Sequence, residues 1–160
     1  MPNSFFTRIR RNHAVEHATL HLLGQRHPNL PLAGHSDQNG FWIVGKVPVE
    51  EVAEVAVQAM ARLRGGQRQL AVHPNCGTNF AVSGMLAGTA AWCALVGAKD
   101  DWQERLERLP LAAVLATLAL VASRPLGPYL QERLTTSADL GELAITAVVP
   151  VKRGGMQANR

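Results

Sequence analysis

The sequence predicts an α+β fold: a small cap of two helices and about three strands, placed on a two-helix transmembrane hairpin. Residues 80–98 contain no charged side chain, and a second apolar run covers 109–123. Such runs approach the length needed to cross a hydrocarbon core of about 30 Å. Elsewhere, helical periodicity alternates with short β-branched segments, which is typical of a mixed domain. We expect residues 1–79 to form the cap, 80–127 the hairpin, and 128–160 a strand that completes the cap and a polar tail.

The first helix is expected from Ser4 to Gln25, because apolar residues recur at helical spacing there. Residues 28–40 are rich in Pro, Gly, Asn and Asp and predict a loop. Phe41-Trp42-Ile43-Val44 has the aromatic and β-branched content of a strand. Pro48 then opens a second helix, which Gly65 and Gly66 end.

Two more strands are expected, at residues 69–72 and within 143–149, and residues 152–160 read as a frayed polar tail. The connection between the two apolar runs, Lys99–Arg108, is densely charged, and the second run is short unless Arg124 snorkels and the helix continues past Pro125. Together, these predicted elements cover the chain.

Charge predicts an orientation for the hairpin. The connection has three basic and four acidic residues, whereas the rest of the chain has thirteen and eight. Basic residues favour the cytoplasmic side, so we expect the cap and both termini to face the cytoplasm. The basic residues are dispersed and few aromatic residues accompany them, which argues against nucleic acid and for a lipid bilayer as partner.

Two further features concern partners and compartment. Gly84 and Gly88 are four residues apart in the first apolar run, the small-xxx-small spacing that lets membrane helices pack closely, so oligomers through this face are expected. The two cysteines, Cys76 and Cys93, give no disulfide framework, which makes a reducing compartment the default.

The first helix contains a pattern of metal-ligating residues. His13, Glu16 and His17 form His-x-x-Glu-His, the inverted order of the zinc-protease pattern His-Glu-x-x-His. Histidines at i and i+4 share a helix face and can bind one cation. His21 continues this stripe. An amphipathic helix with histidines on its polar face is the structural alternative.

A second pattern lies just before the first apolar run. His73 and Cys76 offer an imidazole and a thiolate from one turn, and Gly77 gives that turn freedom. With His13 and His17 they make a donor set that suits zinc. His35 and Asp37 are polar residues of the predicted loop and are expected to be solvated.

The order of these motifs resembles that of a known group of proteins. HAVEH, HPNCGT and LTTSAD resemble motifs of the YqhQ-like bacterial membrane proteins, which are predicted to be metal-dependent. GFWIVGKVPVEEV is more similar to a smaller related family of unknown function. The resemblance implies that the protein is located at a bacterial cytoplasmic membrane. Among the positions shared with the family it adds Thr136, whereas His21, His35 and Asp37 are not shared. This chain is short for the larger family, so no transport pathway is expected.

The leading hypothesis is a zinc-dependent hydrolase at the membrane. His13, His17 and one of His73 or Cys76 would hold Zn²⁺, and Glu16 would act as general base on a peptide or another amide or ester. Asp139 or Glu142 is an alternative downstream ligand.

Two alternatives remain open. If His13, His17, His73 and Cys76 all bind, the site is closed and structural, and the protein is an adaptor or assembly factor, with a membrane-proximal peptide or protein as partner. Without metal, the histidines belong to an ordinary core and the protein is a membrane scaffold.

Overall fold

The computed structural model describes residues 4–98, 102–151 and 155–159 of the 160-residue chain. The chain divides into two compact units, which are described separately below. The first unit contains residues 1–73 and 132–160, and the second contains residues 74–131. The chain therefore leaves the first unit after His73 and returns to it at Glu132.

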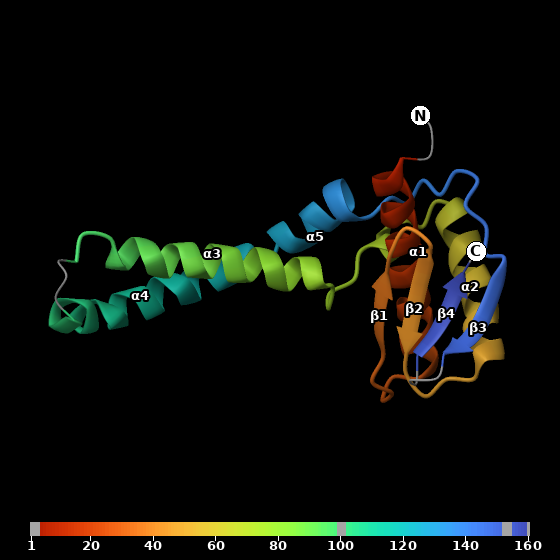
Figure 1. The fold of residues 1–160 in the computed structure, drawn as a ribbon, viewed down its shortest axis with the longest axis horizontal. Coiled ribbons are helices and arrows are strands. Elements are labelled where there is room, and N and C mark those ends of the chain that lie inside the picture. Colours follow the sequence, from red (N-terminus) through yellow and green to blue (C-terminus); the bar gives the residue numbers. More distant parts are fainter. Residues whose placement is uncertain (1–3, 99–101, 152–154, 160) are drawn as a thin grey trace. The chain divides into compact units, whose positions relative to one another are not determined.

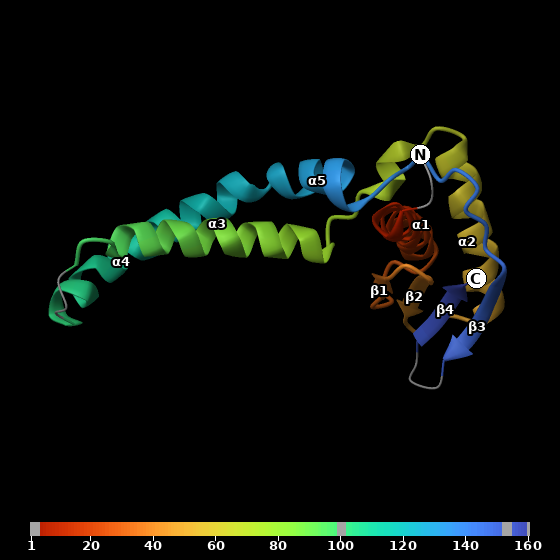
Figure 2. The ribbon, with the colours of Figure 1, turned by 45° about the horizontal axis from the view of Figure 1, so that its top comes forward.

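The first unit is a two-layer arrangement of helices on a sheet (Figures 1 and 2). Its antiparallel sheet has the strand order β1-β2-β4-β3. The strands are β1 (Ala33–Ser36), β2 (Gly40–Val44), β3 (Ala147–Val151) and β4 (Gly155–Asn159). Helix α1 (Phe5–Arg26) packs on β1 and β2, while α2 (Val49–Arg64) packs on β3 and β4. The expected helices and the strand at residues 41–44 are thus confirmed.

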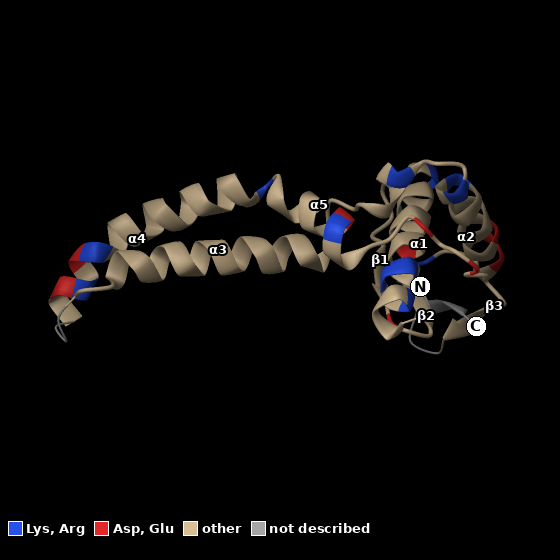
Figure 3. Cartoon of the chain, turned by 90° about the horizontal axis from the view of Figure 1, so that it is seen from above, with Lys and Arg blue, Asp and Glu red and all other residues tan. Residues whose placement is uncertain are grey.

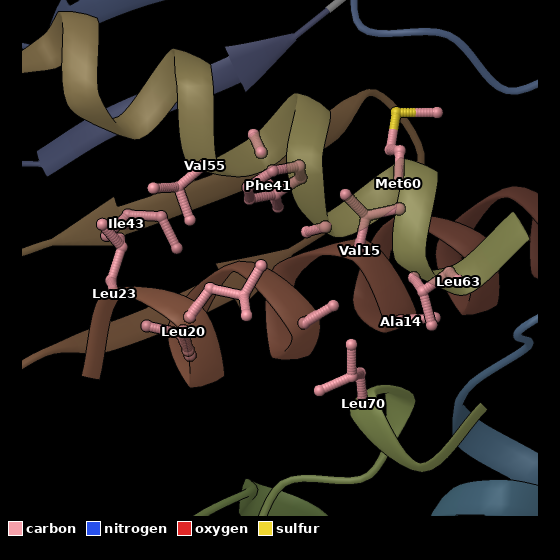
Figure 4. Close-up of a cluster of buried hydrophobic side chains, with 14 of the residues drawn as sticks. Ala14, Val15, Leu20, Leu23, Phe41, Ile43, Val55, Met60, Leu63 and Leu70 are labelled. Carbon is pink, nitrogen blue, oxygen red and sulfur yellow. The ribbon is translucent and has the colours of Figure 1, made fainter. Parts of the chain in front are cut away.

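The core lies between the two helices and the sheet (Figure 4). Phe41 and Ile43 alternate along β2 and are buried toward the helices. Leu23 of α1 and Val55 of α2 are fully buried among them. Acidic residues in the first turn of α2 and arginines in its last turn complement the helix dipole, as the sequence predicts.

The segment predicted as a strand at residues 69–72 is instead a 3₁₀ turn, η1 (Arg68–Ala71), so that prediction was wrong. Hydrogen bonds from Leu70 N to Gln67 O and from Val72 N to Gln69 O close it. The turn buries Leu70, which lies beside α1 in Figure 4. A four-residue apolar run can bury its side chains either as a strand or as a short turn, so the hydrophobic pattern alone does not distinguish these two structures.

Three other expectations about the sheet need correction. The predicted loop at 28–40 contains the edge strand β1, and the predicted tail at 152–160 contains β4. The strand expected within 143–149 begins only at Ala147. Strand β4 supplies the backbone partners that both β2 and β3 need, a role that any residue type fills except proline. Pro150 accordingly lies in β3, at an edge of the sheet.

The second unit is a set of three helices, α3 (Gly77–Leu95), α4 (Trp102–Ser123) and α5 (Leu126–Leu130). Helices α3 and α4 lie side by side along their length in Figures 1 and 2. The hydroxyls of Ser83 and Ser123 join them at 2.7 Å. A single π-helical turn, η2 (Gln131–Thr135), follows α5.

The charged connection expected at 99–108 is mostly helical. Residues 99–101 lie outside the described part, and α4 begins directly after them, at Trp102. An ion pair between Arg108 and Glu104, at 2.6 Å and one turn apart, supports this first turn. The second apolar run is therefore part of a 22-residue helix, which ends at Ser123 and does not continue past Pro125.

Within the described residues, α4 is the one helix long and apolar enough to cross a membrane. Large apolar side chains are nevertheless exposed on both α3 and α4; examples are Met85, Trp92, Leu118 and Val121. In Figure 3, α3 is free of blue and red, and α4 shows them only where it begins. One candidate span is therefore found, where the sequence predicts a hairpin of two.

The glycine pattern of α3 does not serve its packing on α4. Gly84 and Gly88 are exposed, and a Cβ built on either would meet no described atom within 4 Å. Ser83 provides the contact with α4. The small-residue face of α3 is therefore open.

Candidate metal centre

Four imidazoles gather in the first unit. The ring centroids of His13 and His17 are 4.2 Å apart, those of His17 and His73 are 5.6 Å apart, and those of His21 and His73 are 4.7 Å apart. Three of the rings come from one stripe of α1, where residues four apart share a face. The fourth follows η1, which packs against α1.

Main-chain oxygens orient the rings of His13 and His17. Nδ1 of His13 lies 3.0 Å from the carbonyl oxygen of Thr135, and Nδ1 of His17 lies 2.8 Å from that of Ala71. A carbonyl only accepts, so each Nδ1 donates its hydrogen and Nε2 of the neutral ring keeps a lone pair. Histidines that ligate metals are held in this way, with the second ring nitrogen donating to a carbonyl or carboxylate. Potential ligand atoms of the two rings lie within 4.8 Å of one another.

His21 belongs to the same group of imidazoles, although the family resemblance does not include it. Its Nε2 lies 2.8 Å from the carbonyl oxygen of Val72, so Nδ1 of the neutral ring has the lone pair. Ala71 and Val72 are consecutive, and the end of η1 turns one carbonyl toward each of two histidines. The spacing of His13, His17 and His21 is the sequence signal that could have found this member.

His73 is neutral at physiological pH. Its side chain is half-buried, and this burial, together with the neighbouring His21, lowers the pKa of His73 to about 4. A neutral imidazole has a lone pair to offer without first losing a proton.

The segment containing the LTTS motif holds His13 in place. The Arg10 guanidinium donates to the carbonyl oxygens of Arg133 and Thr136, each at 3.0 Å from Nη2. In return, Ser137 N donates to Arg10 O at 3.0 Å. These bonds fix the segment on α1, so that the Thr135 carbonyl meets His13. Thr136 itself is buried, with 1% of its surface exposed.

Glu16 lies on another side of α1, about 100° round the helix from His17. It is 4% exposed, and strand β1 covers it: a Cβ on Gly34 would overlap its carboxylate. Asn12 anchors the chain after that strand by donating to Asp37 O at 2.8 Å. The absence of a side chain at Gly34 therefore makes room for a buried carboxylate next to the histidine stripe.

Cys76 belongs to the second unit, where it caps the N-terminus of α3. Its Sγ lies 3.5 Å from Thr78 N. Three peptide units separate Cys76 from His73, so their Cα atoms are at most about 11 Å apart.

The other polar residues considered from the sequence lie in turns, on the sheet or beside a hollow. Asp139 Oδ1 accepts from Gly141 N, and Asp37 Oδ1 accepts from Asn39 N and Gly40 N, so both stabilise turns. The ring of His35 stacks on Trp42. Glu142 lines a hollow of about 400 Å³ together with Arg8 and Arg11. In the described part of the chain, neither Asp139 nor Glu142 joins a group of potential metal ligands.

Comparison with known proteins places the chain in a family but gives no activity. It is similar to an uncharacterized protein of Picosynechococcus sp., with 34% identity over 142 residues that cover 82% of this chain and 67% of the relative. No solved structure matches it significantly. The resemblance to YqhQ-like proteins stays a prediction. The model of a domain of unknown function, DUF6391, matches residues 8–148. Because this match spans nearly the whole chain, the protein belongs to the DUF6391 family.

Proposed function

We propose that the protein is a zinc-dependent hydrolase that acts beside a membrane, with His13 and His17 as the central ligand pair. The observation that supports this proposal is the pair of bonds from Nδ1 to the Thr135 and Ala71 carbonyls. With Nδ1 donating, Nε2 of each neutral ring keeps the lone pair that a cation would need. Potential ligand atoms of the two rings lie within 4.8 Å of one another. One of His73 or Cys76 would be the third ligand.

The donor set fits zinc. Imidazole and thiolate are the ligands that Zn²⁺ prefers, at about 2.0–2.1 Å for nitrogen and 2.3 Å for sulfur. Two imidazoles on one tetrahedral zinc have ring centroids about 5 Å apart by these bond lengths. The observed separations, from 4.2 to 5.6 Å, bracket that value.

In the reaction, the chain's residues would position the cation and move a proton. When bound, zinc would supply a Lewis acid and lower the pKa of a water molecule. Glu16 would take up a proton from the attacking water and return it to the leaving group, as its place in His-x-x-Glu-His suggests. The substrate class would be a peptide, or another amide or ester, near the bilayer.

Metal content and hydrolysis test this proposal together. The protein is purified in detergent, incubated with zinc sulfate, desalted and assayed for zinc by mass spectrometry. We expect stoichiometric zinc in the wild type, loss of zinc in His13→Ala, and full zinc in the control His35→Ala, whose ring stacks on Trp42 instead.

Activity is then followed with a mixture of fluorescence-quenched peptides. Glu16→Gln should keep its zinc and lose about 10²–10⁴-fold in rate. A wild-type protein without zinc would overturn the proposal.

A structural metal site is the second candidate, because strand β1 covers Glu16 and leaves it 4% exposed. A buried carboxylate can hold the helix against the strand without meeting a substrate. In this case His13, His17, His73 and Cys76 would complete the tetrahedron. X-ray absorption of the zinc-loaded protein separates the two candidates, since four protein ligands exclude the hydrolase, whereas three ligands and a light-atom neighbour support it.

The membrane part of the proposal rests on the second unit. The apolar exposed surface of α3 and α4 suits the interior of a bilayer, and α4 is long and apolar enough to cross it. We propose that α3 crosses beside α4, so that the two helices form a hairpin. The charge difference between the connection and the rest of the chain would place the cap at the cytoplasmic face. The open face at Gly84 and Gly88 would then meet a helix of a second copy.

A further inference from the structure

We propose that the open edge of strand β1 binds an extended peptide as one more strand of the sheet, through the main-chain groups of Gly34 and Ser36. This inference rests on the proposed function, because it states how the peptide substrate of the hydrolase would be held. Peptide binding can nevertheless be measured without zinc and without cleavage.

Strand β1 forms one edge of the sheet (Figure 1). It pairs with β2 on one side, and no strand in the described part of the chain pairs with it on the other. Residues 33–35 are exposed, and Ser36 is partly buried. Proline and charged side chains commonly keep other chains away from a sheet edge, and the strand sequence AGHS has no proline, lysine, arginine or acidic residue. A further strand can therefore approach β1.

The hydrogen bonds of the hairpin show which groups face this edge. Asp37 N donates to Gly40 O at 2.9 Å, so these two residues form the hydrogen-bonded pair that closes the hairpin. Along antiparallel strands such pairs alternate with pairs whose main-chain groups point away from each other. In the register of β1 with β2, Ser36 and Gly34 belong to the second kind. Their two N–H and two C=O groups therefore lie along the open edge.

The opposite edge of the sheet is less suited to a further strand. It is formed by β3, which contains Pro150. Proline has no N–H, and within sheets its nitrogen lies on the open side of an edge strand. This edge therefore lacks a donor at Pro150, whereas β1 has both of its outward donors. An added peptide is expected at β1.

The edge of β1 is next to the proposed general base. A Cβ on Gly34 would overlap the Glu16 carboxylate, so this position of β1 faces α1. Residues opposite each other in neighbouring strands place their side chains on the same face of a sheet. A peptide residue opposite Gly34 would direct its side chain toward α1. The peptide residue opposite His35 would direct its side chain to the outer face, where the His35 ring stacks on Trp42, so an aromatic or apolar residue suits that position.

The size of the edge favours a short peptide over a second copy of the chain. Strand β1 has four residues and is about 13 Å long. Its outward main-chain groups offer two donors and two acceptors, and its small side chains bury little apolar surface. Such an edge does not supply the area of about 800 Å² per partner that a stable protein interface buries. A substrate that leaves after each reaction needs less.

Peptide binding tests the proposal with a pair of variants. The probe is a fluorescein-labelled peptide, Thr-Val-Thr-Phe-Thr-Val-Thr, and its anisotropy is measured with the full chain in detergent and EDTA. Ser36→Pro removes one outward N–H and should weaken binding about tenfold. The matched control Ser36→Ala keeps that N–H and should bind the peptide as the wild type does. Equal affinities in the two variants would overturn the proposal.

A second measurement leaves the protein unchanged, which guards against a folding defect in Ser36→Pro. Two versions of the peptide have N-methyl groups on alternate residues, one version on the Thr residues and the other on Val and Phe. An added strand donates to β1 through only one of these sets, so one version should lose binding and the other should keep it. Equal binding of both versions, or no binding of the unmodified peptide, would contradict an added strand.

The outcomes separate this inference from the proposed function. In a peptide hydrolase, Ser36→Pro should keep its zinc and its kcat and raise KM about tenfold. Zinc-dependent cleavage with the same KM in Ser36→Pro and Ser36→Ala would overturn the site at β1 and leave the hydrolase intact. A wild-type protein that binds the peptide but takes up no zinc would overturn the hydrolase and leave the site. A wild-type dimer in light scattering that Ser36→Pro dissociates would assign the edge to a second copy and overturn the inference.

Discussion

At the scale of single residues, the main chain orients the histidines. Thr135, Ala71 and Val72 each present a carbonyl oxygen to one imidazole, so the identities of their own side chains matter little to the rings. Replacing these residues would not delete the acceptors. Only a change in the path of the backbone would remove them, so the conformations of η1 and η2 matter for the orientation of the histidines.

His73 makes the stability of the metal-free protein depend on pH. The unfolded imidazole has a pKa near 6.5, and the folded one has a pKa of about 4, so unfolding takes up a proton between these values. The contribution of His73 to stability is complete above about pH 6.5, declines as the pH falls, and is constant again below about pH 4. Thermal unfolding at pH 7, 5.5 and 4 should show this loss. His73→Gln should show a smaller loss, and an equal loss in both proteins would contradict the assignment.

At the scale of elements, α1 and β1 meet at Gly34. A methyl group there would overlap the Glu16 carboxylate, so Gly34→Ala should destabilise the protein by about 1–3 kcal/mol, the usual cost of overpacking. Chemical denaturation in detergent measures this change.

Glu16→Ala is the matched test of this contact. In the Glu16→Ala protein, Gly34→Ala should lower the free energy of unfolding much less, because the obstructing carboxylate is gone. Additive effects of the two substitutions would show that the glycine is needed for another reason.

The elements also differ in how far the sequence predicts them. Helices α1 and α2 repeat their apolar residues over several turns, and β2 has Phe41, Trp42, Ile43 and Val44 in succession, so their signals are strong. Strand β4 has the sequence GMQAN and forms because two neighbouring strands need partners, which is a tertiary effect. The same applies to the candidate metal centre. His13, His17 and His73 can be predicted from sequence motifs, whereas the hydrogen bond between His21 and the Val72 carbonyl depends on η1, a turn that no sequence pattern specifies.

At the scale of the whole molecule, Cys93 tests whether α3 lies in lipid. It is an exposed, free thiol on an uncharged helix. In liposomes we expect it to resist a membrane-impermeant maleimide, because a thiol surrounded by acyl chains meets neither reagent nor water.

Gln103→Cys provides the control, since residue 103 lies in the exposed, charged first turn of α4. It should react when its side of the membrane is treated. Labelling of both positions at equal rates, located by peptide mass spectrometry, would contradict a bilayer position for α3.

The division of the first unit between two distant parts of the chain affects the order in which the protein is made. During synthesis α1, β1, β2 and α2 emerge first, but the edge of β2 has no partner until β4 follows more than a hundred residues later. Thr135 also arrives after α3 and α4 are complete. The cap therefore closes, and His13 takes up its final orientation, only after the apolar helices have left the ribosome, so insertion into a membrane would precede completion of the proposed metal centre.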